Sequence, residues 1–349
     1  MRPKIKLSFA LVAAAALALS ACSTNASTSA PASSGASGGK LSVAHMVSQA
    51  LGDQSFFDDA ESGVQRLKAD GHTTFTQQSD ANNPTQWKTN TEQLSGKYDI
   101  VIVGSSQMTD ILNEVAQKYP NQKYIIYDDV VNQPNVASIT FKQNEGSFLA
   151  GALAALVTTN PSKFPNATGS KVIGLVGGMD VPVIQDFVVG FKAGAEAVDP
   201  SVQVKTAFIG DFTNSQKGHD LAMSMFTNDK ADVVYQVAGG AGVGILQAAK
   251  DAGRYGIGVD SNQNALQPGF ILASMLKHMG NGVYTAVTAA QDGKLEYGKT
   301  TVYGLANDGV GLTFDNNNNI VPQDIQDKVK DFGKQVIDGK IKVPTTTGG

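Results

Sequence analysis

The chain alternates short apolar runs with longer amphipathic stretches, and this rhythm limits the possible folds more than any other feature. Runs such as IVIVG (100–104) and VIGLVG (172–177) are apolar without alternation, as expected of strands that are covered on both faces. The stretches between such runs have helical periodicity. A repeated order of strand, helix and strand is typical of parallel sheets with right-handed crossovers. The sequence therefore predicts an α/β fold.

The rhythm occurs twice, on either side of residues 158–171, which are rich in Pro, Asn, Ser and Gly. Expected strands are 41–46, 99–103, 123–127, 136–141, 171–176, 202–209, 231–237 and 256–259. Expected helices include 109–118, 145–156, 183–197, 217–226 and 244–252. A chain of this length exceeds a comfortable single core. We therefore expect two doubly wound, Rossmann-like lobes that face each other across a cleft.

Polar and aromatic residues gather where the expected strands end. In open parallel sheets, ligands bind beyond the carboxyl ends of the strands. The first half has GDQSFFDDAESG (52–63), GSSQ (104–107) and two aspartates (128–129) at such ends. The second half has GGMDVP (177–182), GDFTNSQKG (210–218), AGGAGVG (238–244) and DSNQ (260–263). A turn does not require aromatic residues such as Phe56, Phe57 and Phe212. We therefore interpret the carboxyl ends of these strands as a ligand-binding site.

The residue types at these ends suit a flat, partly polar ligand. Aromatic faces can sandwich a planar ring, which adds about 0.5–1.5 kcal/mol per pair beyond burial. Carboxylates accept strong hydrogen bonds from ring N–H or sugar hydroxyl groups, and glycines let the backbone approach closely. Beyond the three rings, the candidate contacts from these strand ends and the following helix are Asp58, Ser105, Asp128, Phe187 and Asp260.

Structural roles remain open for the aromatic candidates. Phe56 or Phe57 could begin a helix and staple it to the core. Phe187 follows Pro182, a plausible first helical residue, so core packing competes with ligand contact there.

The acidic candidates have structural alternatives as well. Asp260 could cap a helix, and Asp128 and Asp129 could simply form a turn.

The sequence gives little evidence for a catalytic or nucleotide-binding motif. GGAGVG (239–244) lacks the G-x-G-x-x-G register, and the run GKLEYGKT (293–300), which matches G-x-x-x-x-G-K-[ST] by letter, does not follow an expected strand as a phosphate-binding loop should. The four histidines show no metal-binding spacing. The run GASGG (35–39) matches G-x-S-x-G by letter, but it lies in the small polar segment 23–40 and not between an expected strand and helix, where a nucleophile elbow would stand. We therefore expect a non-enzymatic binding protein with no cofactor or metal, while a hydrolase that uses scattered aspartates remains open.

The N-terminus predicts export and lipid attachment. Three cations precede an apolar stretch, 7–19, that is too short for a comfortable membrane span. The stretch ends in Leu-Ser-Ala-Cys, a pattern that resembles a bacterial lipobox and implies cleavage after residue 21 and lipidation of Cys22. Cys22 is the only cysteine of the chain, so it has no disulfide partner. Residues 23–40 are small and polar and read as a tether of about 20–25 Å.

The formal net charge of the chain argues against one class of partner, nucleic acid. Removing residues 1–21 takes away three cations and no acids, which moves the formal net charge from −4 to −7. A mildly acidic protein without a dense basic stripe is a poor candidate for nucleic acid. We expect a monomer on the extracytoplasmic face of the membrane, held by the lipid on Cys22.

The residues resemble the basic membrane protein family of substrate-binding lipoproteins, which includes purine nucleoside receptors of ABC transporters. The matching stretches are GDQSFFDDAESG, YDIVIVGSSQMTDILNEVAQKYPNQKYIIYDD, NVASITFKQNEGSFLAGALAAL, KVIGLVGGMDVPVIQDFVVGFKAGAEAVDP, GDFTNSQKG, ADVVYQVAGGAGVGILQAAK and IGVDSNQ. They cover nearly all of the chain after residue 40, in the family's order. The resemblance implies the type I periplasmic-binding fold, with lobes at 41–141 plus about 278–303 and at 142–277 plus about 304–349.

The resemblance also implies site roles. Phe56 matches the loop aromatic that stacks on a purine, and Asp128 matches the acid that reads the base edge. Asp260 matches the ribose carboxylate and Lys277, in ILASMLKH, the ribose lysine. Gly239 lies in the glycine turn beside them, and Phe187 and Phe212 are the candidates for the opposite aromatic face.

One departure from the family weakens the transfer of specificity. Phe57 stands where the family commonly has Asn, so a planar ligand other than a purine nucleoside becomes thinkable. The expected function is lobe closure on a nucleoside and its delivery to an ABC permease. The alternatives are another metabolite such as a sugar or signalling molecule, a sensory receptor, and an exported nucleoside hydrolase.

Overall fold

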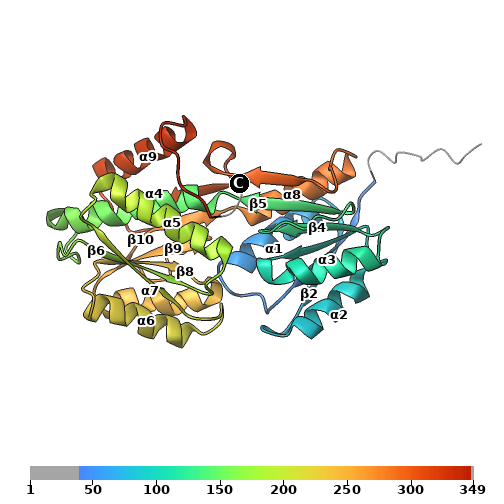
Figure 1. The fold of residues 1–349 in the computed structure, drawn as a ribbon, viewed down its shortest axis with the longest axis horizontal. Helices are drawn as coiled ribbons and strands as arrows, with labels where there is room; N and C mark the ends of the chain where they lie inside the picture. The colour runs from blue at the N-terminus through green and yellow to red at the C-terminus, as the bar shows by residue number, and fades with distance from the viewer. Residues whose placement is uncertain (1–38, 347–349) are drawn as a thin grey trace, which may run out of the picture. The chain divides into compact units, whose positions relative to one another are not determined.

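The computed structural model describes residues 39–346, and the strands in this range form two six-stranded sheets (Figure 1). The first sheet has the order β11-β5-β4-β3-β1-β2 and the second β12-β10-β9-β8-β6-β7. All pairings are parallel except that of β10 with β12. The α/β fold with two parallel-dominated sheets that the sequence predicted is confirmed.

The strands of the two sheets have the following bounds. In the first sheet they are β1 (Ser42–Val47), β2 (Thr73–Gln78), β3 (Ile100–Gly104), β4 (Lys123–Tyr127), β5 (Val136–Phe141) and β11 (Thr300–Tyr303). In the second they are β6 (Val172–Gly177), β7 (Gln203–Phe208), β8 (Val233–Val237), β9 (Tyr255–Asp260), β10 (Ile271–Lys277) and β12 (Val310–Thr313).

Helices follow most of the strands. They are α1 (Phe56–Ala69), α2 (Pro84–Leu94), α3 (Thr109–Lys118), α4 (Gln143–Thr159), α5 (Pro182–Val198), α6 (Ser215–Thr227), α7 (Gly242–Asp251), α8 (Met279–Gln291) and α9 (Gln323–Ile337). Short 3-10 turns are η1 (Ser106–Met108), η2 (Pro161–Lys163), η3 (Gly239–Ala241) and η4 (Leu305–Asn307).

Both sheets are buried on both faces, which explains their unbroken apolar runs. In β3, Ile100 and Ile102 pack with α1 and α8, while Val101 and Val103 pack with α2 and α3. The second sheet has α4 and α5 on one face and α6 and α7 on the other. Because successive side chains point to opposite faces, each buried strand needs apolar residues throughout its length.

The chain passes between the two sheets three times, after β5, after β10 and after β11. The first passage leads directly into α4, whose close partner is α5 of the second sheet. The turn-rich segment 158–171 therefore lies within the second half rather than between the halves, and its loop is held by the buried carboxylate of Asp232, which accepts from the backbone of residues 168–170. Composition alone placed this passage too late in the chain.

The eight expected strands are all present, with ends that agree to within two residues, but the strands β2, β10, β11 and β12 were not expected. Edge strands β2, β11 and β12 carry few buried residues, so they leave little apolar signal. The run 52–63, expected as a loop, is a loop only to Ser55, because α1 begins at Phe56. Asp260 does not cap a helix, since bends and turns follow β9.

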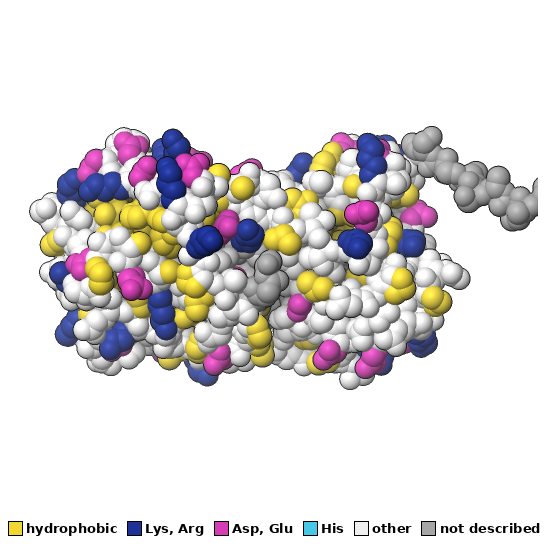
Figure 2. Space-filling view, turned by 45° about the horizontal axis from the view of Figure 1, so that its top comes forward, with side chains coloured by type: hydrophobic (Ala, Val, Ile, Leu, Met, Phe, Trp, Pro, Cys, Tyr) yellow, Lys and Arg dark blue, Asp and Glu magenta, His cyan; other side chains and the backbone are white. Residues whose placement is uncertain are grey.

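The described residues contain no helix long and apolar enough to cross a membrane. The signal peptide, Cys22 and all of the tether except residues 39 and 40 lie outside the described residues. On the face shown in Figure 2, cationic and acidic side chains are interspersed rather than gathered into one basic stripe.

Gly194→Ala should destabilise the protein because α4 and α5 approach through glycines. A Cβ at Gly194 would overlap the backbone carbonyl of Phe148, and one at Gly151 would overlap that of Phe191. Overpacking of this kind typically costs about 1–3 kcal/mol, measured here as the free energy of unfolding in urea. Gly311→Ala in β12 is the matched control, because its Cβ would meet open space. Equal stability of the two variants would contradict this packing.

Candidate ligand-binding site

A pocket lies where the carboxyl ends of the strands of the two sheets meet. It holds about 620 Å³ of space not filled by protein atoms, part of which is open to solvent. The first half of the chain contributes Gln49, Asp53, Phe56, Phe57, Ser105, Ser106, Gln107 and Asp128. The second half contributes Val183, Ile184, Phe187, Phe212, Val237, Gly239, Val259, Asp260 and Lys277.

Four pocket residues have left-handed backbone at the end of a strand. Their φ angles are 80° at Ser105, 70° at Asp128, 64° at Asp260 and 53° at Gly239. Only glycine adopts this region freely, and other residues there cost of order 1 kcal/mol or more. The repetition at the ends of β3, β4, β8 and β9 indicates that each strand turns sharply at the pocket.

A buried ion pair joins the two halves across the pocket. The ammonium of Lys277, the last residue of β10, contacts Asp128 Oδ1, directly after β4, and both side chains are almost fully buried. The same ammonium lies 5.9 Å from the ring centre of Phe56 and 5.2 Å from that of Phe187. Burial raises the pKa of Asp128 and the Lys277 charge opposes that shift.

Asp260 adds a second acidic group from the second sheet. Ser55 Oγ donates to Asp260 Oδ2 at 2.5 Å, which links the loop before α1 to the end of β9. Burial raises the pKa of Asp260 to about 7, although Lys277 and the hydrogen bond from Ser55 act in the opposite direction. Asp260 therefore keeps its proton to a higher pH than an ordinary aspartate does.

Further hydrogen bonds hold the 52–55 loop against the second sheet. Ser261 Oγ donates to the carbonyl of Ser55 at 3.2 Å, and Gln263 Nε2 donates to the carbonyl of Gln54 at 2.9 Å. The run DSNQ (260–263) thus has two uses, because Asp260 lines the pocket while the residues after it bridge to the facing loop.

The acids around the start of α1 have local partners. Asp53 accepts from the backbone N–H groups of Ser55, Phe57 and Asp58, which would otherwise lack partners at a helix start. Asp58 accepts from the N–H groups of Gly52 and Gln54, both at 2.8 Å. Asp58 therefore lies in the first turn of α1, where it holds the preceding loop instead of lining the pocket. Asp53 lines the pocket and was missed.

The phenylalanines form the apolar walls. Phe56 packs edge to face on Phe57, with ring centres 4.9 Å apart. Phe57 is 6% exposed and Phe187 2% exposed, so both also serve the core. The Phe212 ring lies on Gly178, where a Cβ would overlap it, so glycine is required there.

Of the sequence-predicted site residues, all except Asp58 line one pocket. Missed residues fall into two groups. Asp53 and Gln107 lie inside runs already noted at strand ends, so their position placed them near the pocket but did not distinguish them from their neighbours. Gln49 and the aliphatic residues Val183 and Ile184 carry no pattern that separates them from ordinary loop and core residues. In residues 39–346 no cluster of His, Cys, Asp and Glu is arranged to hold a metal ion.

The fold and the pocket between two sheets define the class as that of ABC solute-binding proteins of the periplasmic-binding type. A solved solute-binding protein from Aeropyrum pernix has a TM-score of 0.78 and 26% identity and covers 87% of this chain and 94% of its own. The model of the Bmp family, PnrA-like ABC transporter substrate-binding proteins, matches residues 40–347. The chain belongs to this family.

Two curated relatives agree with that assignment. The ABC transporter nucleoside-binding protein BmpA of Lactococcus lactis is 32% identical over 320 residues, covering 84% of this chain and 86% of its own. The CD4+ T-cell-stimulating antigen of Listeria monocytogenes is 32% identical over 317 residues, covering 84% of each chain.

Asp260→Asn should flatten the dependence of stability on pH. An unfolded Asp titrates near pH 4, whereas Asp260 titrates at about 7 in the folded protein. Between these values only the folded state keeps the proton, so the free energy of unfolding should fall as the pH rises, by up to about 1.4 kcal/mol per pH unit.

Urea denaturation at pH 5 and at pH 7 measures this slope. Asp199→Asn is the control, because hydrogen bonds from Ser201 and Lys171 hold the pKa of Asp199 at about 2, below the window. A wild-type slope in Asp260→Asn would contradict the assignment.

Proposed function

We propose that the protein is a lipid-anchored receptor that binds a nucleoside, with a purine favoured, and delivers it to an ABC permease. The observation that carries the proposal is the buried Lys277 of the pocket. Its ammonium contacts Asp128, and its charge acts to lower the pKa of Asp260. The same ammonium lies beside the rings of Phe56 and Phe187. A nucleoside combines a flat base with a ring of hydroxyl groups, and this pocket offers apolar faces and charged groups side by side.

The polar lining favours a neutral ligand rich in hydrogen-bond donors. Three carboxyl groups, of Asp53, Asp128 and Asp260, and one ammonium line the pocket. Ser105 Oγ is buried and has no hydrogen-bond partner among the described residues, which leaves a polar group for a ligand to satisfy. A phosphate group would face this excess of acids, so a nucleotide is disfavoured.

The residue roles follow the family resemblance with one adjustment. We propose that Asp260 and Lys277 hold the ribose hydroxyl groups and that Phe56 stacks on the base, opposite Phe187 or Phe212. Asp128 is tied to Lys277 through one oxygen, so its other oxygen is the one that would read the base edge. Gly239 lets the backbone approach closely, and Phe57 supports Phe56 from the side.

Delivery requires a change of shape on binding. We propose that the two sheets with their helices act as lobes, 41–141 plus about 278–303 and 142–277 plus about 304–349, and that ligand favours their closed arrangement by contacting both. The lipid on Cys22 would keep a monomeric receptor near its permease, and no nucleic acid is involved.

A second candidate keeps the fold and changes the ligand to another metabolite, such as a sugar or signalling molecule. The ring of Phe57, where relatives of this kind commonly have an amide, motivates it. Mass spectrometry of ligand released from denatured protein separates the two, because a nucleoside mass supports the first and any other mass the second. The same nucleoside incubated with the protein should stay intact, and release of free base would instead indicate a hydrolase.

Calorimetric titration with a panel of nucleosides, free bases and nucleoside 5′-monophosphates should show binding of nucleosides and weaker binding of the monophosphates. Phe56→Ala should weaken every planar ligand by about fivefold, since a stacked ring contributes about 1 kcal/mol. Phe75→Ala is the control, because Phe75 is exposed on β2, stacks on Tyr98 and does not line the pocket. No heat from any nucleoside or base would rule out the nucleoside assignment.

Cys22→Ala should move the protein from the membrane fraction to the soluble fraction in cells that export it. The variant should also fail to incorporate an alkyne-labelled fatty acid, while Ser23→Ala should retain both label and membrane association. Continued membrane association of unlabelled Cys22→Ala protein would contradict a lipid anchor.

A further inference from the structure

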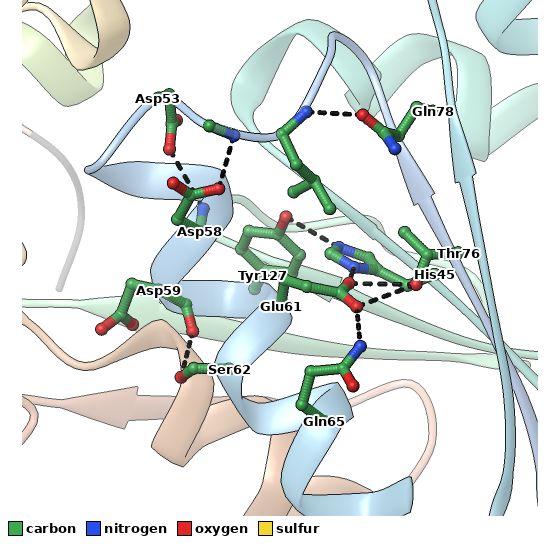
Figure 3. Close-up of polar contacts among 12 residues, drawn as sticks. His45, Asp53, Asp58, Asp59, Glu61, Ser62, Gln65, Thr76, Gln78 and Tyr127 are labelled. Atoms are coloured by element: carbon green, nitrogen blue, oxygen red, sulfur yellow. Dashed lines mark hydrogen bonds and ion pairs between the residues drawn. The ribbon is translucent and has the colours of Figure 1, made fainter.

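A buried polar network lies beside the pocket without lining it. His45 of β1 lies between Glu61 of α1 and Tyr127 of β4 (Figure 3). Its Nδ1 is 2.7 Å from Glu61 Oε2, and its Nε2 is 3.1 Å from Tyr127 Oη. All three side chains are buried. Two strands of the first sheet, β1 and β4, and the helix α1 are thus joined by hydrogen bonds.

The protonation of the network follows from its partners. Burial acts to raise the pKa of Glu61, but hydrogen bonds from His45, Gln65 and Thr76 outweigh it and hold the pKa below its usual value. A charged carboxylate only accepts, so His45 Nδ1 donates to it. Burial raises the pKa of Tyr127 well above its usual range, so its hydroxyl keeps the proton and forms a hydrogen bond with His45 Nε2 at 3.1 Å.

Tyr127 connects this network to the pocket. Its ring centre lies 5.5 Å from that of Phe56, and Asp128 follows it directly in the chain. The Tyr127 ring also lies on Gly104, where a Cβ would overlap it, and Ser105 is the next residue. Phe56, Asp128 and Ser105 therefore all depend on where this one ring sits.

Stability alone does not account for these groups. Apolar side chains of similar volume usually fill a core at equal or lower free energy than a buried acid and its partners. Hydrogen bonds, unlike apolar contacts, constrain the orientation of the groups that they join. Here they constrain the Tyr127 ring, which packs against Phe56, and the first turns of α1, the helix that begins at Phe56.

We propose that Glu61, His45 and Tyr127 are positioning residues for the ligand pocket, which set the place of Phe56 and Asp128 without touching ligand. This inference rests on the proposed binding function. It predicts that loss of a bond inside the network weakens ligand binding, whereas loss of an equivalent buried bond elsewhere in the same strand does not.

Strand β4 offers a matched pair for the test. Tyr124 is also buried, and its hydroxyl lies 2.7 Å from Ser95 Oγ, in the separate core formed with α2 and α3. Tyr127→Phe and Tyr124→Phe each remove one buried tyrosine hydroxyl and keep the ring. Calorimetric titration with the nucleoside that binds wild type most tightly should show a loss of affinity of about fivefold for Tyr127→Phe and a change within about twofold for Tyr124→Phe. Equal affinities of the two variants would overturn the proposal.

A second measurement reads the ring itself and needs no ligand. In protein labelled with 4-fluorophenylalanine, Glu61→Gln should shift or broaden the fluorine resonance of Phe56 and leave that of Phe226, in the core of the second sheet, unchanged. Substitution of each phenylalanine by leucine assigns the two signals. An unmoved Phe56 signal would overturn the proposal even if Tyr127→Phe fails to fold. Silence of wild type toward nucleosides, with a moved Phe56 signal, would instead refute only the nucleoside assignment.

Discussion

The buried contact between Lys277 and Asp128 is the interaction on which the rest of the pocket depends. Lys277 ends a strand of one sheet and Asp128 follows a strand of the other, so the pair forms only when the carboxyl ends of the two sheets meet. Removing one partner would leave an uncompensated buried charge, which typically costs about 3–5 kcal/mol. The pair therefore both orients the two halves and keeps an ammonium in a site walled by phenylalanine rings.

The aspartates around this ammonium have different roles because their hydrogen-bond donors differ. Asp53 and Asp58 accept backbone N–H groups and shape the loop that leads into α1. Asp260 instead has a serine hydroxyl as its partner, and burial raises its pKa to about 7. The three aspartates thus have different roles that depend on the donors around them: Asp58 holds the loop, Asp53 caps the start of α1, and Asp260 is an acid of the pocket.

The sequence predicted the architecture well because buried parallel strands leave a strong apolar signal. Edge strands such as β2 leave no such signal. They form by pairing with a neighbouring strand, and the sequence alone does not show this pairing. The strand-end rule located Phe56, Asp128 and Asp260, while Lys277 came from the family resemblance, since no local pattern marks the end of β10. Asp58 and Asp53 could not be told apart from sequence, because which carboxylate turns inward depends on the backbone of residues 52–55. The sequence did not predict the network of His45, Glu61 and Tyr127 for a related reason, because these residues lie on separate elements that meet only in the folded protein.

A crystal structure of the protein with its ligand bound tests the central claim most directly. The account predicts one nucleoside between Phe56 and a phenylalanine of the second half, with its polar groups within hydrogen-bond distance of Lys277 and Asp260. A ligand found outside this pocket, or a pocket filled by the protein's own side chains while ligand binds elsewhere, would contradict it.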